Sequence, residues 1–268
     1  MMRRYEMSSR LETAINASIE AGKEVLEVYN SDFIVETKED RSPLTLADKN
    51  AHACIMRHLA ATGLPVLSEE GSNIPYDERK NWDVFWMVDP LDGTKEFVKR
   101  NGEFTVNIAL ISHGNPTAGV IYVPVKEILY FGSAEHGAHK CVHNISEKQT
   151  LTSLLNDATT LPVHEKKAEF VVVASRSHMS KETEDFIAEL KKEHRRVEVT
   201  SIGSSLKICL VAEGAADIYP RFAPTMEWDT AAGHAIVKAS GKEIYDYTTS
   251  LPMKYNKENL LNNCFVAK

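Results

Sequence analysis

The segment Asp89-Pro90-Leu91-Asp92-Gly93-Thr94 carries the densest group of reactive side chains in the sequence. Two carboxylates on a sharp turn can converge on one point, and Pro90 and Gly93 are residues that fix such a turn. Hard divalent cations such as Mg²⁺ prefer carboxylate and carbonyl oxygens. If a helix begins after Gly93, its first backbone amides can also hold a phosphate. On its own the segment is equally compatible with an ordinary surface turn, because Asp, Pro and Gly dominate turns for conformational reasons.

Further acids occur at comparable places in the chain. Glu69 and Glu70 follow the short apolar run 65–67, so a strand again ends in carboxylates. Asp229 stands where a helix is expected to begin, with Thr230 and small residues behind it. Asp at a helix start most often caps the helix, and Glu70 fits a solvated loop better than a site. Together with Asp89 and Asp92, however, Glu69 and Asp229 make an acidic metal site a hypothesis worth carrying.

Helices and strands in the first half must hold these acids. Apolar residues recur at helical intervals over 9–29 and 45–62, which predicts two helices. The apolar run 84–88 predicts a strand that ends at Asp89. Further strands are expected over 104–112, 117–123 and 127–133, separated by turn residues, and they indicate an antiparallel meander.

The second half has a different pattern. Residues 134–168 are polar and suggest an edge strand followed by a surface excursion. From 169 onward, strands and helices alternate, and we expect strands at 170–174, 197–201, 217–219 and 243–247 and helices at 180–194, 204–213 and 228–239. Alternation of this kind is typical of an α/β architecture. The chain therefore divides near 160 into an α+β sub-domain (1–160) that carries most of the candidate metal ligands and an α/β sub-domain (161–268) that carries Asp229, with a cleft between them.

Composition excludes several classes of protein. With 31 Lys plus Arg against 38 Asp plus Glu, the formal charge is −7, which argues against a nucleic acid polymer as partner. An anionic ligand would need cations to mediate its binding. No apolar run is long enough for a transmembrane segment, and the N-terminus has no secretory signal, so we expect a cytoplasmic protein. The four cysteines, Cys54, Cys141, Cys209 and Cys264, form no Cys-x-x-Cys pair and are interpreted as buried thiols.

One group of potential zinc ligands is rejected at this stage. His136, His139, Cys141 and His143 lie within eight residues but lack the paired spacing of a zinc site, and a solvent-facing strand explains them better. Dinucleotide, P-loop, hydrolase-elbow and EF-hand motifs are absent from the sequence. The basic run 191–196 at a helix end is interpreted as solvated, with peripheral attachment to the inner membrane as the weaker alternative.

Taken in order, the motifs resemble those of a known family. Leu44-Thr-Leu-Ala-Asp48, Ser68-Glu69-Glu70, Asp89 to Thr94 and Trp228-Asp-Thr-Ala-Ala-Gly233 follow the order and spacing of the Mg²⁺-dependent, lithium-sensitive inositol monophosphatase superfamily. The resemblance covers nearly the whole chain. Gly93 to Phe97, Asn101 to Asn107, Ser175 to His178 and Ser201 to Lys207 are similar to the 3'(2'),5'-bisphosphate nucleotidases of the CysQ type. An inositol monophosphatase is expected to have Thr-Asn-Phe after Asp-Gly-Thr, and Lys95-Glu96 departs from that sequence.

The resemblance implies a fold and a metal site. The fold would be a layered αβαβα sandwich of the inositol monophosphatase and sugar phosphatase type. Glu69, Asp89 and the Leu91 carbonyl would hold one Mg²⁺, and Asp89, Asp92 and Asp229 a second, with a third ion left open. Two metals can activate a water and neutralise the attacking and leaving oxygens of a phosphoryl transfer. The implied catalytic residues are Glu69 and Thr94, with Asp48 orienting the Thr94 hydroxyl so that it relays a proton.

The resemblance also implies a substrate. Ser175, His178, Gly203, Ser205 and Lys207 match positions that contact the nucleoside and its retained phosphate, beside Gly93 and Thr94, and Arg221 is a weaker candidate. The implied reaction is hydrolysis of the 3'-phosphate of adenosine 3',5'-bisphosphate to AMP and phosphate in sulfur assimilation, with its sulfated precursor as a further substrate to consider. The alternatives kept open are an inositol or fructose bisphosphate phosphatase and a catalytically weak binding regulator. A monomer or weak homodimer is expected.

Overall fold

The computed structural model describes residues 4–31, 35–37, 43–71, 74–142, 148–163, 169–175 and 180–268. The helices are α1 (Arg4–Tyr29), α2 (Leu46–Ala60), α3 (Tyr76–Arg79), α4 (Thr94–Val98), α5 (Leu151–Asp157), α6 (Lys181–Glu193), α7 (Leu206–Glu213) and α8 (Glu227–Ala239). The strands of the larger sheet are β3 (Val66–Ser68), β4 (Val84–Asp92), β5 (Thr105–Ser112), β6 (Asn115–Val123), β7 (Ile128–Ser133), β8 (Gly137–Val142) and β9 (Thr159–Leu161). The remaining strands are β1 (Val35–Thr37), β2 (Pro43–Thr45), β10 (Phe170–Ser175), β11 (Val197–Ile202), β12 (Tyr219–Arg221), β13 (Ile244–Asp246) and β14 (Phe265–Ala267).

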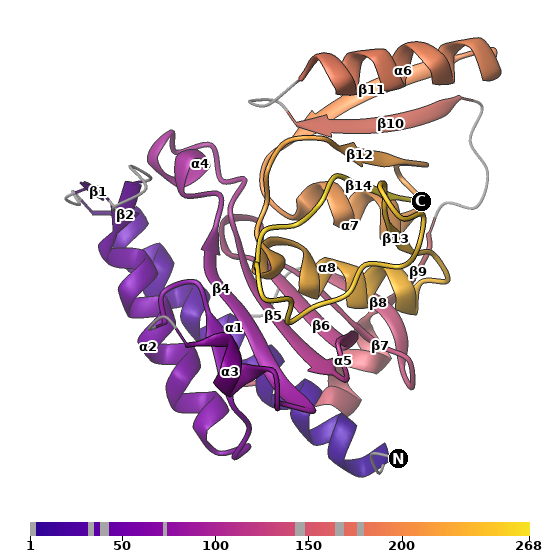
Figure 1. Cartoon of the computed structure of the whole chain (residues 1–268). Helices are drawn as coiled ribbons and strands as arrows, with labels where there is room; N and C mark the ends of the chain where they lie inside the picture. Colours follow the sequence, from indigo (N-terminus) through magenta and orange to yellow (C-terminus); the bar gives the residue numbers. More distant parts are fainter. Residues whose placement is uncertain are drawn as a thin grey trace.

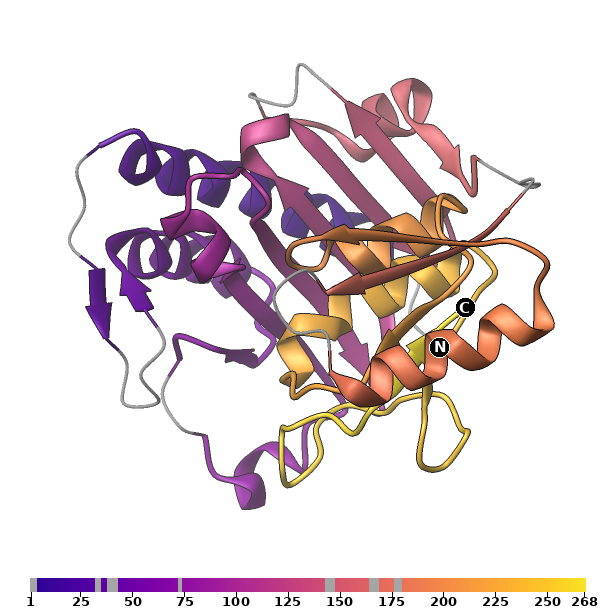
Figure 2. The same cartoon turned by 90° about the horizontal axis from the view of Figure 1, so that it is seen from above.

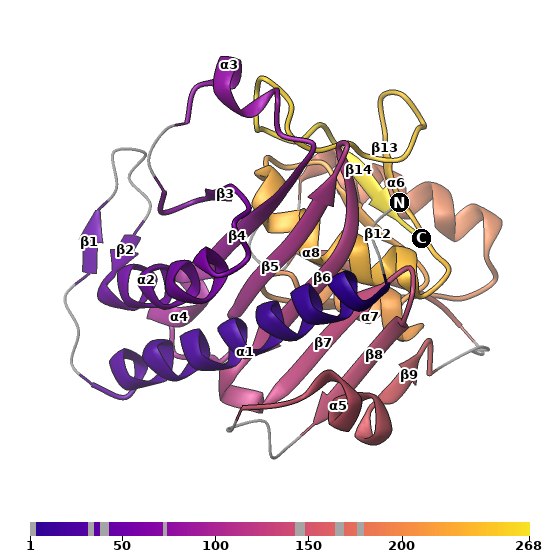
Figure 3. The same ribbon diagram turned by 90° about the horizontal axis from the view of Figure 1, so that it is seen from below.

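A seven-stranded sheet in the order β3-β4-β5-β6-β7-β8-β9 forms the centre of the molecule (Figure 3). Strands β3 and β4 are parallel and every later neighbour is antiparallel, which confirms the predicted meander. Both faces of β4 are buried: Trp86 and Val88 belong to one core, and Phe85 and Met87 to the other. A strand covered on both faces is expected to be continuously apolar, as 84–88 is.

Helices α1 and α2 cover one face of this sheet (Figures 1 and 3). Leu11, Ile15 and Val25 of α1 are buried at helical spacing, and so are Ala51 and Ile55 of α2. Both helices lie where the periodicity predicts them. Within the described residues, no helix is both long and apolar enough to cross a membrane.

Helices α7 and α8 cover the opposite face (Figure 1). The contact between α8 and β6 is close because Gly119 has no side chain: a Cβ at this position would lie 2.2 Å from the Ala232 carbonyl oxygen. Ala231, Ala232 and Ile236 of α8 complete this core. The small residues after Asp229 thus allow the helix to pack directly on the sheet.

A second layer of strands lies beyond α7 and α8, with α6 outermost (Figures 1 and 2). Strands β10 and β11 are parallel, whereas β12, β14 and β13 form an antiparallel sheet, and the parallel bridge between Val172 and Ile218 links the two. Ile187 and Leu190 of α6 pack on this layer in a small third core. The order of layers is therefore αβαβα, as the resemblance implies.

The structure corrects one prediction and adds several elements. His139 and Cys141 of β8 are buried, not solvent-facing, because β9 and α5 cover the part of the chain expected to be an edge. The His139 ring stacks on Phe131, and its Nε2 lies 2.7 Å from the His136 carbonyl oxygen. His143 lies outside the described residues. The β1–β2 pair, α5, β9 and β14 were not predicted.

Candidate active site

A cleft of about 340 Å³ opens where the end of β4, the start of α7 and the start of α8 meet. Its lining contains most of the residues singled out in the sequence: Glu69, Asp89, Leu91, Asp92, Gly93, Thr94, Ser175, Gly203, Ser205, Lys207, Arg221 and Asp229. A volume of this size suits a small-molecule ligand. Asp48 is fully buried near the start of α2 and is not part of the lining. His178 lies outside the described residues.

The parallel pairing of β3 and β4 brings two acids to the same edge of the sheet. Both strands end there, and the Glu69 amide donates to the Val88 carbonyl oxygen at 3.1 Å. Glu69 is therefore held beside Asp89, although 20 positions separate them in the sequence. Glu70 follows Glu69 but does not line the cleft.

The irregular end of β4 orients its two acids by local geometry. The register between β4 and β5 shifts between Asp89 and Asp92, so the intervening residues leave the regular ladder. The Leu91 amide donates to Asp89 Oδ1 at 3.1 Å, and the Thr94 hydroxyl donates to the Leu91 carbonyl oxygen at 3.3 Å. Gly93 has φ of 90° and lies against the Glu103 carbonyl, so a side chain there would be strained and crowded. Gly93 is thus required by the shape of the backbone at this point.

The carboxylates repel one another strongly in this cleft. Burial raises the pKa of Asp89 well above its usual value, and the charges of Glu69, Asp92, Asp229 and Asp48 raise it further. The pKa of Asp229 is also well above its usual value, because of removal from solvent and repulsion by Asp92. Such a group of acids is expected to bind cations, which would relieve the repulsion.

Asp229 has two roles in the geometry. Helix α8 begins at Glu227, so the N-cap residue is Met226 and not Asp229 as expected; Asp229 is the third residue of the helix, and its Oδ2 accepts a hydrogen bond of 2.8 Å from the Met226 amide. The same side chain lines the cleft together with Asp92. Asp229 therefore contributes to the start of α8 from inside the helix and also faces the cleft.

Ser205 links the two halves of the cleft. Its amide donates to Asp92 Oδ2 at 2.6 Å, and its hydroxyl lies 2.6 Å from the same oxygen and 2.8 Å from the Asp229 carbonyl oxygen. Asn107 Nδ2 also donates to the Ser205 hydroxyl at 3.0 Å, and Glu103 accepts from the Gly203 amide at 2.7 Å. Asn107 and Glu103 were not among the candidate residues. A buried Asn inside an otherwise apolar strand was the signal that could have identified Asn107.

Two cationic side chains line the cleft at the side of the second layer. Lys207 is almost fully buried and donates to the Ser204 carbonyl oxygen at 2.6 Å and to the Ile202 carbonyl oxygen at 3.3 Å. Burial lowers the pKa of Lys207 to about 8, against the opposing attraction of Asp92. Arg221 Nη2 donates to the Pro224 carbonyl oxygen at 3.2 Å and leaves its buried Nε with no hydrogen-bond partner. Both cations are placed to meet an anionic group.

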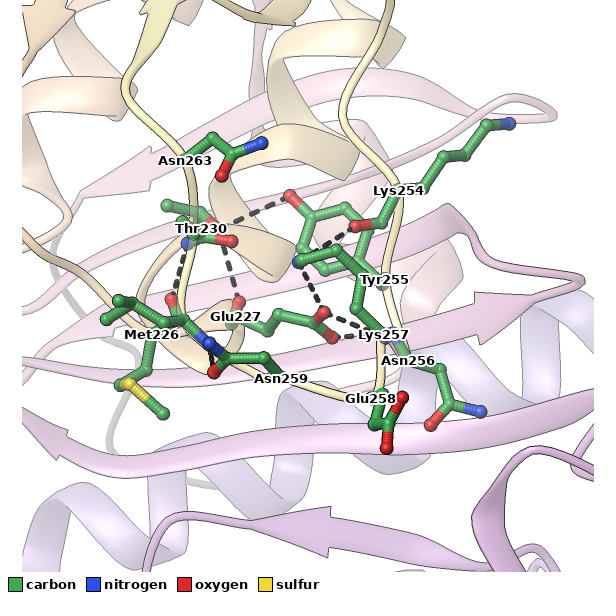
Figure 4. Close-up of polar contacts among 12 residues, drawn as sticks. Met226, Glu227, Thr230, Lys254, Tyr255, Asn256, Lys257, Glu258, Asn259 and Asn263 are labelled. Atoms are coloured by element: carbon green, nitrogen blue, oxygen red, sulfur yellow. Dashed lines mark hydrogen bonds and ion pairs between the residues drawn. The ribbon is translucent and has the colours of Figure 1, made fainter. Parts of the chain in front are cut away.

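A network of polar contacts around the buried Glu227 joins the start of α8 to residues 254–259 (Figure 4). Glu227 is fully buried; its carboxylate accepts from the Asn256 amide at 2.6 Å and from the Lys257 amide at 3.0 Å, and it pairs with the Lys257 ammonium at 2.5 Å. Arg79 of α3 binds the same segment, donating to the Lys257 carbonyl oxygen at 2.6 Å. The position of Asp229 therefore depends on contacts made two residues earlier in the same helix.

The comparisons with known proteins agree with this geometry. Residues 6–264 match the model of the inositol monophosphatase family. The chain is 46% identical over 250 residues to a Shigella flexneri protein and 44% identical over 250 residues to an Escherichia coli K12 protein, each match covering 91% of this chain and 94% of the relative. Both relatives are named 3'(2'),5'-bisphosphate nucleotidase CysQ.

Solved structures lead to the same family. The crystal structure of CysQ from Bacteroides thetaiotaomicron, described as a bacterial member of the inositol monophosphatase family, is 51% identical to this chain, with a TM-score of 0.90 over 97% of each chain. An inositol monophosphatase from Thermotoga maritima is 21% identical, with a TM-score of 0.73 over 97% of this chain and 92% of its own, and it shares the fold.

Proposed function

The chain belongs to the inositol monophosphatase family, and from that membership we propose that it is a 3'(2'),5'-bisphosphate nucleotidase. It hydrolyses the 3'-phosphate of adenosine 3',5'-bisphosphate to give AMP and phosphate, in nucleotide recycling linked to sulfur assimilation. The observation that carries the proposal is the convergence of Glu69, Asp89, Asp92 and Asp229 on one cleft that also contains Lys207. In such a cleft the acids can bind the metal ions that hold the phosphate to be cleaved. The lysine can bind the second phosphate of a nucleoside bisphosphate.

The chemistry of the donor atoms fits magnesium. Carboxylate oxygens and the Leu91 carbonyl are hard ligands, and the raised pKa values of Asp89 and Asp229 mark a site where added positive charge is favourable. In this proposal Glu69, Asp89 and the Leu91 carbonyl would hold one Mg²⁺, and Asp89, Asp92 and Asp229 would hold a second. When bound, the ions lower the pKa of a water molecule and offset charge on the phosphoryl oxygens.

The chain's own groups then position the reactants. Thr94 Oγ1 lies on the cleft wall beside the Leu91 carbonyl, where it can exchange a proton with a water molecule near Glu69. Asp48 orients this hydroxyl in the proposal; its carboxylate lies close enough to Asp89 to raise the pKa of that group. The Ser205 bonds to Asp92 fix one wall of the cleft, so that the acids are held before substrate arrives.

The second phosphate and the nucleoside bind on the side of α7 and β12 in this proposal. Lys207 and Arg221 supply positive charge there, and Ser175, Gly203 and Ser205 line the same wall. His178 remains a proposed contact outside the described residues. An inositol or fructose bisphosphate phosphatase would use the same acids, and the Lys207 wall favours the nucleotide.

The remaining expectations form part of the same proposal. Residues 1–160 supply Glu69 and the turn acids, and residues 161–268 supply Asp229 and the nucleotide wall. Cytoplasmic action is consistent with the four free cysteines. Light scattering would test the expected monomer or weak homodimer, and a vesicle sedimentation assay would test membrane association.

The first experiment measures Mg²⁺-dependent phosphate release from adenosine 3',5'-bisphosphate, inositol 1-phosphate and fructose 1,6-bisphosphate in parallel, each with and without lithium. We expect a clear preference for the nucleotide and inhibition by lithium. Preference for a sugar phosphate would leave the proposed metal ligands unchanged and would contradict the proposal that the Lys207 side of the cleft binds a nucleotide. No release from any of the three would favour a binding regulator that has kept the fold.

A further inference from the structure

A second group of potential metal ligands lies far from the cleft lining, on the outer helical layer. Cys54 and His58 are one turn apart on α2, and Glu20 faces them from α1. One donor atom from each of the three residues lies within 4.8 Å of the other two. His58 Nε2 and Glu20 Oε2 are 2.9 Å apart. None of the described residues of α1 or α2 lines the cleft, so this cluster is not part of the active site.

The three donors form a set that suits zinc. Thiolate, imidazole and carboxylate are the protein ligands of Zn²⁺, and its bonds of roughly 2.0 to 2.3 Å place neighbouring donors roughly 3.4 Å apart in a tetrahedron. The donor atoms lie within 4.8 Å of one another, so a small movement of the side chains would bring them to this spacing. Glu20 can provide it, because its side chain is 51% exposed and belongs to a flexible residue type. Magnesium, by contrast, binds oxygen ligands and has no preference for a thiol.

Burial gives the cluster an inner and an outer side. Cys54 is fully buried between the two helices, whereas the His58 side chain is 27% exposed. An ion can therefore enter from solvent past Glu20 and His58, and water can complete its coordination on that side. Burial raises the pKa of the Cys54 thiol to about 11, and the charges of Glu20 and Glu24 add to this rise against the opposing charge of Arg57. An ion that binds here must therefore displace the thiol proton.

We propose that Glu20, Cys54 and His58 bind a zinc ion that joins α1 to α2. The Cys54 thiol loses its proton to solvent as the ion binds, and a water molecule occupies the remaining position. The ion takes no part in turnover; it stabilises the helical layer that covers the central sheet, because an ion that binds only the folded chain shifts the equilibrium toward that state.

The test uses cobalt as a spectroscopic probe of the full-length chain. Protein stripped with a chelator is given excess Mg²⁺ to fill the carboxylate cleft and is then titrated with Co²⁺. We expect one equivalent to produce a thiolate-to-cobalt absorption band in the near ultraviolet, and Zn²⁺ to remove it by displacement. No cysteine is among the described residues that line the cleft, so Co²⁺ bound there would give no such band.

Three variants decide whether the band belongs to this cluster. Cys54→Ser should lose the band. His58→Gln, a change at a partly exposed residue, should weaken Zn²⁺ binding by at least roughly tenfold and abolish the zinc-dependent rise in Tm. The matched control Cys264→Ser, at a half-buried free cysteine, should keep both. The Mg²⁺-dependent activity of His58→Gln should equal that of the wild type.

Several results would overturn the proposal. Absence of the band in the wild type would mean that Glu20 and His58 form only an ion pair. A band that survives Cys54→Ser, or that disappears in Cys264→Ser, would assign the thiolate to another residue. Equal zinc affinity in the wild type and His58→Gln would show that the His58 imidazole is not a ligand of the ion.

Discussion

Glu227 and Asp229 stand two residues apart at the start of α8, and their surroundings are opposite. Glu227 is fully buried, and burial raises its pKa, but two backbone amides and the Lys257 ammonium oppose that shift. Asp229 accepts one amide and otherwise faces the acids of the cleft, chiefly Asp92. A buried acid whose partners are all supplied by the chain is part of the framework. An acid such as Asp229, which lies among other acids, is suited to bind a metal ion from solution.

The largest effect is expected where the acids are most crowded. Asp89→Asn should lower Mg²⁺-dependent kcat by at least about a thousandfold, because it removes the carboxylate proposed to bind both ions. The metal-free variant should have a Tm no lower than that of the wild type, since one repelling charge is gone. Steady-state kinetics and thermal unfolding with and without Mg²⁺ check both statements.

Asp83→Asn is the matched control for this variant. Asp83 lies just before β4, at the end opposite Asp89, and its side chain is 82% exposed. It should leave both kcat and Tm unchanged. Unchanged activity in Asp89→Asn would remove the two-metal assignment.

Lys207 tests whether the cation of the cleft serves the substrate. Lys207→Met should lower kcat/KM for adenosine 3',5'-bisphosphate by about tenfold to a hundredfold, the usual contribution of a hydrogen bond to a charged group. The loss should be smaller for inositol 1-phosphate, which has no second phosphate, and Lys207→Arg should recover part of it. Equal losses on both substrates would assign Lys207 a structural role through its bonds to Ser204 and Ile202.

Glu227→Gln tests whether the buried Glu227 and its partners stabilise the fold. The change keeps the size of the side chain and removes its charge-assisted bonds, so the free energy of unfolding should fall by about 1–3 kcal/mol. Urea denaturation measures this loss. Asp77→Asn, at an exposed ion pair with Lys80, should show no measurable loss and serves as the control. If the two variants were equally stable, Glu227 would not be the anchor of α8.

The smallest effect is a difference in pH dependence. In the metal-free protein the pKa values of Asp89 and Asp229 lie above that of an unfolded Asp, about 3.9. The folded chain thus binds these protons more tightly than the unfolded chain. This contribution to stability is complete below pH about 3.9 and is lost as the pH rises through the raised values.

Asp89→Asn should therefore gain stability relative to the wild type near neutral pH, and this advantage should shrink on acidification toward pH about 5. Urea denaturation of both proteins in a chelator at several pH values measures the difference. Parallel pH profiles would mean that the acids of the cleft do not repel one another as the geometry indicates.

Local patterns predicted most of the elements that carry the acids. The periodicity of α1 and α2 and the apolar run at the start of β4 are short-range signals, and the Asp-Pro-Leu-Asp-Gly-Thr segment forms the end of β4 and the start of α4. Contacts between distant residues were not predictable in this way. Asn107 and Ser205 are 98 positions apart, and β14 pairs with both β12 and β13 from the end of the chain. The burial of His139 has the same origin, because β9, which covers it, has a polar sequence.

The glycine at position 119 has a consequence for the chemistry of the cleft. With no Cβ there, the Ala232 carbonyl of α8 rests directly on the backbone of β6. Asp229 lies in the first turn of the same helix, while Asp89 belongs to the sheet. The distance between these two acids therefore depends on the backbone contact between α8 and the sheet. A methyl group added at position 119 would push α8 away from the sheet. The dimensions of the proposed ion site would then change without any substitution among its ligands.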